Sequence, residues 1–102
     1  MNKPKVLKKE EIKKALKSLK GWSFGDDKIT KEFKFLDFVG SLSFLNRMVA
    51  YFQEMDHHPD VHIFYNKIKF ELQRFDSGAK VTDRDIEVAK KIEETYKTEN
   101  KL

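Results

Sequence analysis

The sequence predicts an α+β fold in which a four-stranded antiparallel sheet carries three helices on one face, in the element order α-β-β-α-β-β-α. Three observations support this prediction. Three segments place apolar residues at the three- and four-residue spacing of an amphipathic helix. Four shorter segments alternate apolar and polar residues, as half-buried strands do. These strands come in two consecutive pairs, each joined by a short turn, which is typical of antiparallel hairpins.

The first helix is predicted over residues 9–20. Its apolar face is made by Ile12, Ala15, Leu16 and Leu19. Gly21 follows the last periodic residue and indicates a left-handed stop. A hairpin comes next, in which residues 22–24 and 29–36 flank a Gly-Asp-Asp-Lys turn. In its second arm, Lys31 is the charged exception on an otherwise apolar face.

The longest periodic segment begins after Asp37, a suitable N-cap, and is predicted to continue as a helix to about His57. Its central apolar stripe is made by Phe38, Leu42, Leu45, Val49 and Phe52, and is widened by Val39, Met48 and Met55. Phe44, Tyr51 and Met48 lie beyond the centre of that stripe. Because this arc is wider than packing on one sheet requires, we expect part of it to contact a second subunit.

Two more strands are predicted at residues 61–65 and 68–72, with Asn66-Lys67 as the turn between them and a loop over residues 76–80. Thr82-Asp83-Arg84-Asp85 resembles a capping box with Asp in place of Glu, and it is predicted to open the last helix. The inward residues of this helix are Ile86, Ala89, Ile92 and Tyr96. We expect its tail to fray from Lys97.

Length and composition indicate a single domain over residues 1–102. The chain has no Cys, which excludes disulfides, a thiolate nucleophile and a cysteine zinc site, and which favours a reducing, cytoplasmic setting. No apolar run is long enough to span a membrane, and the N-terminus lacks the apolar region of a secretory signal. The net charge is +4, but no base-reading motif accompanies the lysines, so we expect no direct nucleic-acid binding.

The candidate functional stretch is Glu54-Met55-Asp56-His57-His58-Pro59-Asp60, with two adjacent histidines between the long helix and the third strand. Pro59 disfavours helical geometry at His58, so the pair is predicted to lie where the helix ends. Histidine exchanges protons near neutral pH, and two histidines in unequal environments can serve as acid and base.

Three interpretations of His57, His58 and His62 remain open from the residues alone. They can be surface or helix-capping residues. They can be metal ligands, although neighbours in extended chain point to opposite sides and no fourth ligand is evident. They can also perform metal-free acid/base catalysis on a small polar substrate.

The ordered motifs His57-His58-Pro59, Tyr65-Asn66-Lys67 and Thr82-Asp83-Arg84-Asp85-Ile86 resemble those of the pterin-4a-carbinolamine dehydratase family. The resemblance extends over nearly the whole chain. It implies the fold predicted above, assembly into homodimers or homotetramers, and a pterin substrate. It also implies an enzyme that dehydrates 4a-hydroxytetrahydropterin to quinonoid dihydropterin during recycling of tetrahydrobiopterin-type cofactors, without a metal or organic cofactor.

By this resemblance His57 and His58 are the catalytic pair, with either one as the acid. Substrate-binding roles are expected for Pro59, Phe75, Asp85 and His62. Asp85 matches a late acidic position of the family and can orient an imidazole or hold a pterin N–H, or it can be an early-turn helix residue without such a role.

Two positions depart from the family pattern. Phe75 stands where the family has a third histidine or a tryptophan, and Gln53 stands where it usually has a charged residue. Phe can stack on a pterin but cannot move a proton. The resulting hypotheses are a slower enzyme that relies on His57 and His58, compensation by His62, or a member that has lost catalysis. The last would be a pterin-binding or protein-dimerisation module resembling a transcriptional coactivator.

Overall fold

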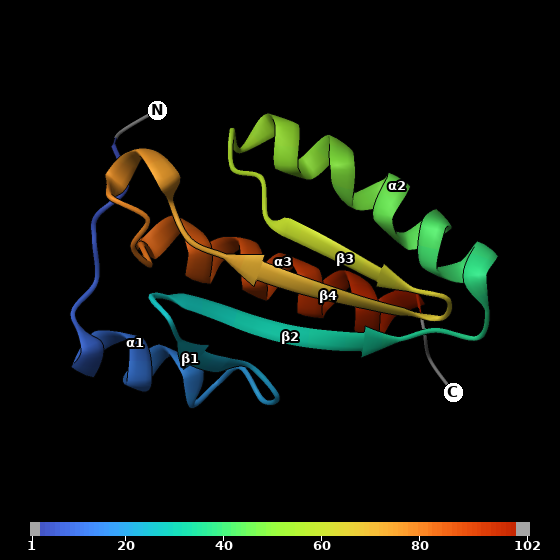
Figure 1. The fold of residues 1–102 in the computed structure, drawn as a ribbon, viewed down its shortest axis with the longest axis horizontal. Coiled ribbons are helices and arrows are strands. Elements are labelled where there is room, and N and C mark those ends of the chain that lie inside the picture. The colour runs from blue at the N-terminus through green and yellow to red at the C-terminus, as the bar shows by residue number, and fades with distance from the viewer. Residues whose placement is uncertain (1–2, 100–102) are drawn as a thin grey trace.

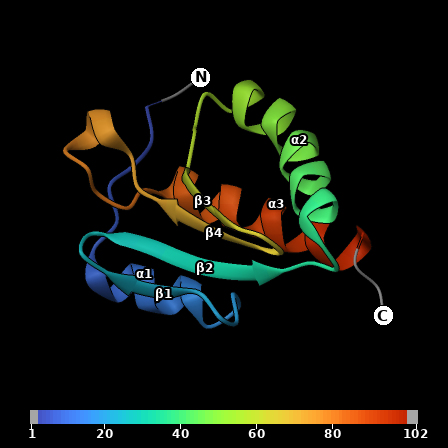
Figure 2. The same ribbon diagram turned by 45° about the vertical axis from the view of Figure 1, so that its right-hand side comes forward.

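The computed structural model describes residues 3–99 and forms a four-stranded antiparallel sheet with three helices on one face (Figures 1 and 2). The elements are α1 (Lys9–Leu16), β1 (Ser23–Gly25), β2 (Lys28–Lys34), α2 (Phe38–Glu54), β3 (Asp60–Phe64), β4 (Lys67–Leu72), the short 3-10 segment η1 (Phe75–Ser77) and α3 (Asp83–Glu99). The strand order is β1-β2-β4-β3, so β1 and β3 are the edges. The predicted fold class and element order are confirmed.

Local sequence signals set the first hairpin and the start of α2. Asp26 and Asp27 have positive φ angles of 53° and 59°, the geometry of a two-residue turn between β1 and β2. Asp37 caps α2, because its side chain accepts a hydrogen bond from the Gly40 N–H at 2.8 Å. These two predictions are confirmed. The turn between β3 and β4 lies one residue earlier than predicted, with Tyr65 at φ 47°.

The first helix is shorter than predicted, since α1 ends at Leu16 rather than near residue 20. The chain continues in turns whose N–H groups bond three residues back, as Leu19 does to the Leu16 carbonyl at 3.1 Å. Leu19 is nevertheless buried, so the predicted apolar face is retained. Gly21 has the expected positive φ, 88°, and a Cβ atom there would lie 2.8 Å from Lys31 Cε.

Lys31, the charged residue on the inner face of β2, has two polar partners. Its ammonium forms an ion pair with Glu93 of α3 and donates to the Lys20 carbonyl at 2.9 Å. Glu93 also accepts a hydrogen bond from Trp22 Nε1 at 3.0 Å. Because a charge on a mostly buried face is tolerated only when it is paired, this exception to the alternation ties β2 to α3.

The buried face of α2 differs from the predicted stripe. Its buried residues are Ser41, Phe44, Met48 and Phe52. Phe38, Val39 and Val49 are exposed instead, so the predicted centre of the stripe was wrong by part of a turn. Phe44 and Met48 are buried and Tyr51 packs against the core, so these three candidates for contact with a second subunit are not exposed apolar residues.

The core lies between the inner face of the sheet and the helices. The fully buried apolar residues of β2, β4 and α3 are Ile29, Ile68, Phe70, Leu72, Val88, Ala89 and Ile92. Residues that alternate with these on β2 and β4 are mostly charged and lie on the opposite face, which the helices leave uncovered. Phe33 makes edge contacts with three other aromatic rings, including Trp22 at 6.0 Å between centroids.

An N-terminal strap, residues 5–7, pairs with the segment that opens α3. The Leu7 N–H donates to the Val81 carbonyl at 3.0 Å, and the Asp83 N–H donates to the Lys5 carbonyl at 3.0 Å. The Asp83 carboxylate in turn accepts from the Lys5 N–H at 3.0 Å. Backbone hydrogen bonds therefore fix the start of α3 to a segment that lies 78 residues earlier in the sequence.

The C-terminal helix begins and continues as its sequence signals indicate, with two differences of detail. Thr82 precedes α3 as predicted, and Ile86, Ala89 and Ile92 are buried. The helix extends to Glu99, beyond the predicted fraying point at Lys97. The helices formed by residues 3–99 do not include one with the length and apolar character of a membrane span.

Candidate active site

The histidine pair follows a left-handed helix stop that the sequence analysis did not predict. Helix α2 was expected to reach His57, but it ends at Glu54. Asp56 then adopts a positive φ of 50°. Its N–H donates to the Gln53 carbonyl at 3.1 Å, and the His57 N–H donates to the Phe52 carbonyl at 3.0 Å. This is the Schellman arrangement, in which Asp takes the place usually held by Gly.

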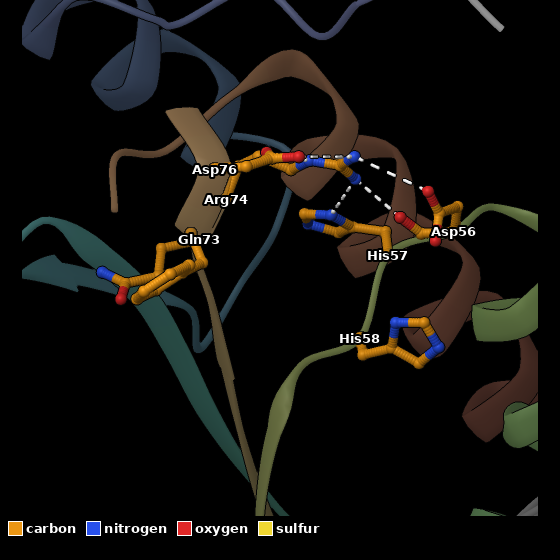
Figure 3. Close-up of a pocket in the computed structure, with 7 residues that line it drawn as sticks. Asp56, His57, His58, Gln73, Arg74 and Asp76 are labelled. Atoms are coloured by element: carbon orange, nitrogen blue, oxygen red, sulfur yellow. Dashed lines mark hydrogen bonds and ion pairs between the residues drawn. The ribbon is translucent and has the colours of Figure 1, made fainter. Parts of the chain in front are cut away.

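His57 lies inside the protein and uses both ring nitrogens. The residue is 3% exposed. Its Nε2 is hydrogen-bonded to Asp85 Oδ1, and its Nδ1 lies 3.1 Å from Arg74 Nη1 (Figure 3 shows the Arg74 contact). Since a guanidinium can only donate, Nδ1 accepts this bond and Nε2 carries the ring proton toward the Asp85 carboxylate.

Asp85 caps the first turn of α3 and also contacts the imidazole of His57. Its Oδ2 accepts hydrogen bonds from the Thr82 N–H at 2.7 Å and the Thr82 hydroxyl at 2.9 Å, so the carboxylate half of the predicted capping box is present. Its Oδ1 meets His57. The side chain is fully buried, so it reaches the cavity only through the imidazole that it orients.

His58 differs from His57 in exposure and in partner. The residue lies at the surface, and its Nε2 is hydrogen-bonded to the side-chain oxygen of Gln53. The family resemblance led us to expect a charged residue at position 53, and here the neutral amide of Gln53 contacts the second histidine. The two adjacent histidines therefore have unequal surroundings, one buried against a carboxylate and one open to solvent.

A cavity of about 330 Å³ lies beside the two histidines, where β4 ends and the chain approaches β3. Its lining residues are Asp56, His57, His58, Gln73, Arg74, Phe75 and Asp76 (Figure 3). Phe75 is 87% exposed, so its ring is available at the rim. Pro59 and Asp85 do not line the cavity. Pro59 follows His58 in the sequence, and Asp85 is hydrogen-bonded to His57.

Sequence reasoning missed the lining residues Gln73, Arg74 and Asp76, and Arg74 is the one of these that contacts His57. Its Nε donates to Asp76 Oδ1 at 2.8 Å, and its Nη1 donates to the Asp56 carbonyl at 2.6 Å (Figure 3). The only sequence signal was its place beside Phe75, the position where the resemblance expects a third histidine. An arginine at the end of an alternating strand is ordinarily a surface residue, so that signal was weak.

His62 is not brought to this cavity. It lies on the uncovered face of the sheet, because Val61 on the same strand packs against the core. Its Nε2 is hydrogen-bonded to Glu71 at 2.9 Å. This bond, with Lys28 and Lys69 nearby, holds the pKa of Glu71 below its ordinary value. Within residues 3–99, no group of three His, Asp or Glu side chains is arranged to hold a metal ion.

A solved structure agrees with this fold. A crystal structure from Brucella melitensis, described as a transcriptional coactivator/pterin dehydratase, matches with a TM-score of 0.83 and 34% sequence identity. The alignment covers 88% of this chain and 97% of that one. The fold and the histidine-lined cavity thus define an α+β protein of the pterin dehydratase class.

Sequence comparison gives the family. The model of the family described as Pterin 4 alpha carbinolamine dehydratase matches residues 5–95, and the chain belongs to this family. A protein of Sulfurisphaera tokodaii provisionally named pterin-4-alpha-carbinolamine dehydratase is 44% identical over 88% of this chain and 96% of its own. One from Aquifex aeolicus with the same name is 35% identical over 89% and 91%. Membership supports pterin-4a-carbinolamine dehydratase activity, and the predicted resemblance is confirmed.

Proposed function

We propose that this protein is a cytoplasmic dehydratase that converts 4a-hydroxytetrahydropterin to quinonoid dihydropterin during recycling of a tetrahydrobiopterin-type cofactor. Membership of the family supports the reaction. The observation that supports the site is the pair His57 and His58 on the wall of one cavity, with Asp85 behind the first ring. The reaction eliminates water without a change of oxidation state, and we propose that it needs no metal or organic cofactor.

The dehydration requires two proton transfers, and we assign one to each histidine. The 4a-hydroxyl leaves as water when it receives a proton, while a ring nitrogen of the pterin loses its proton and its electron pair forms the new C=N bond. His57 suits the base role, because Asp85 holds its Nε2 proton and would stabilise the imidazolium that forms. His58 suits the acid role, because its exposed ring can regain a proton from solvent.

Substrate contacts are proposed for the residues that surround this pair. Phe75 offers a flat apolar face at the rim on which a bicyclic pterin can stack. Pro59 fixes the chain directly after His58. Asp85 acts through His57. A contact with His62 would require the substrate to reach the uncovered face of the sheet, so it is the weakest of the predicted contacts.

We further propose a homodimer or homotetramer. The edge strand β3 and the adjoining turn expose Ile63, Phe64 and Tyr65, and α2 exposes Phe38, Val39 and Val49. The rings of Phe38 and Tyr65 stack with centroids 6.4 Å apart, so the two sets are continuous. Apolar side chains along an unprotected strand edge favour association with another chain. Light scattering on the purified protein would show a monomer if this proposal is wrong.

The test of the main proposal is dehydration of enzymatically generated 4a-hydroxytetrahydropterin by the purified protein. We expect a rate clearly above that of the uncatalysed reaction, and an equal rate would reject the enzyme. Pterin binding, measured by fluorescence quenching, distinguishes the alternative of a binding or dimerisation module. Tight pterin binding without turnover would favour that alternative, which the names of the relatives do not favour at present.

A further inference from the structure

Arg74 is held between two walls of the cavity by three neighbours. Its bonds to Asp76 and to the Asp56 carbonyl join the 3-10 segment η1 to the stop that follows α2. Its Nη1 also meets His57 Nδ1 at 3.1 Å. Only 15% of the side chain is exposed. Because both its Nε and its Nη1 are hydrogen-bonded, the guanidinium has one orientation relative to the imidazole of His57.

This contact determines the protonation state of the ring. A guanidinium carries donors only, so a proton on His57 Nδ1 would place two N–H groups against each other. The opposite nitrogen faces the Asp85 carboxylate, which needs a donor. The arrangement therefore contains a neutral imidazole with its proton on Nε2 and its lone pair on Nδ1, toward Arg74 and the cavity.

The charges around His57 oppose one another. Asp85 of α3 brings a carboxylate to Nε2, and Arg74, just after β4, brings a guanidinium to Nδ1. The carboxylates of Asp56 and Asp76 are mostly exposed and face Arg74.

Two further titratable or charged neighbours have hydrogen-bond partners of their own. Arg84 of α3 donates to the Met55 carbonyl at 3.1 Å. His58 is engaged with Gln53. Among residues 3–99, Arg74 is therefore the cation that meets the Nδ1 lone pair directly.

We propose that Arg74 is a positioning residue that keeps His57 neutral, with the Nδ1 lone pair directed at the cavity, until a substrate N–H replaces the arginine N–H. This inference rests on the proposed function, because it requires His57 to act as the base. The substrate proton moves to Nδ1, the Nε2 proton stays with the ring, and the resulting imidazolium is paired with Asp85. The guanidinium moves its Nη1 away from His57 and remains bound to Asp76 through Nε.

Arg74 also lies next to the position where the family resemblance implies a third histidine. Phe75, at that position, cannot exchange protons. Arg74 precedes it directly and places a permanent charge next to the base. We infer that this chain relies on two histidines for proton transfer and on Arg74 to keep one of them ready to accept.

Nitrogen chemical shifts of ¹⁵N-histidine-labelled protein at pH 7 test this inference without an activity assay. In the unmodified protein we expect His57 to show a protonated Nε2 and an unprotonated Nδ1. Arg74→Met removes the donor and the charge, so both nitrogens should be protonated, as an imidazolium beside Asp85. Arg74→Lys keeps a charged donor and should retain the neutral ring. Arg47→Met, which removes an exposed arginine paired with Glu99, is the matched control and should change nothing at His57.

A protonated Nδ1 in the unmodified protein would overturn the inference, even if Arg74→Met failed to fold. A neutral His57 in folded Arg74→Met would overturn it as well.

Turnover provides the second readout. A base that is already protonated cannot accept the substrate proton, so Arg74→Met should lower kcat at pH 7 by about 10² or more. This loss should diminish as the pH rises, whereas a loss from altered structure alone would not depend on pH in this way. If the unmodified protein does not dehydrate the pterin, the proposed function fails, but the nitrogen shifts still decide the role of Arg74.

Discussion

His57 and Asp85 share a buried hydrogen bond although 28 residues separate them in sequence. One carboxylate oxygen of Asp85 meets the imidazole, and the other caps the first turn of α3 through Thr82. The same side chain thus begins a helix and orients a candidate base. The position of the imidazole consequently depends on the correct start of α3.

Asp85→Asn should impair stability and turnover together. An amide has one acceptor oxygen, so either Thr82 or His57 loses its partner inside the protein, at a cost of about 1–3 kcal/mol in unfolding free energy. With the ring misoriented, kcat should fall at least about tenfold. Urea unfolding and steady-state turnover measure the two effects. Glu87→Gln, on the exposed side of the same helix, is the control and should alter neither. Wild-type values for Asp85→Asn would contradict the dual role.

His58→Ala should reduce kcat by about 10² to 10⁴ while the protein stays folded. The ring is exposed and contributes little to the core, so unfolding free energy should change by less than about 0.5 kcal/mol. His62→Ala is the informative comparison, because that histidine lies on the uncovered face of the sheet. A loss at His62 as large as that at His58 would show that the substrate binds on the other face.

Asp56→Gly and Glu54→Gly should have opposite effects on stability. Asp56 has a φ of 50°, which glycine adopts without steric cost, so unfolding free energy should rise by up to about 1 kcal/mol. Glu54 is the last residue of α2, where glycine should instead cost up to about 1 kcal/mol. Thermal and urea unfolding of both variants give the comparison. Equal destabilisation would mean that the left-handed stop is not what ends the helix.

Glu71→Gln should weaken the protein at neutral pH and not in acid. The pKa of Glu71 is lowered first by its bond with His62 and then by Lys28 and Lys69, so the folded protein binds its proton less readily than the unfolded chain does. A lowered carboxyl pKa stabilises the fold above the unfolded value, near pH 4.3, and this contribution is lost as the pH falls through the folded value. The free energies of unfolding of the two proteins, measured with urea, should therefore differ at pH 7 and converge as the pH falls through the folded pKa of Glu71. Lys28→Gln should show a smaller effect of the same sign.

Local signals made much of the fold predictable. The Asp26-Asp27 turn, the Asp37 cap and the opening of α3 at Thr82 depend on residues within a few positions of one another. Helix and strand periodicity gave the order of elements for the same reason. The predicted end of α2 was wrong. It was placed at His57 because of Pro59, whereas the chain leaves helical geometry earlier, at Asp56.

Contacts between distant residues could not be predicted in the same way. Arg74 meets His57 only after β4 has been placed beside the end of α2. Lys31 was visible as an exception, but its partner Glu93 lies 62 residues further along the chain. The buried face of α2 was misplaced because an apolar arc this wide fits the sheet at more than one rotation, and packing selects among them.

The pairing of residues 5–7 with residues 81–83 has a practical consequence for anyone who produces this protein. A purification tag or a truncation that displaces Lys5 or Leu7 would break the backbone hydrogen bonds that hold Asp83 in place, two positions before Asp85. Such a preparation could fold normally and still perform poorly in assays. Affinity handles are therefore better placed at the opposite terminus, and activities obtained with N-terminal fusions need comparison with untagged material.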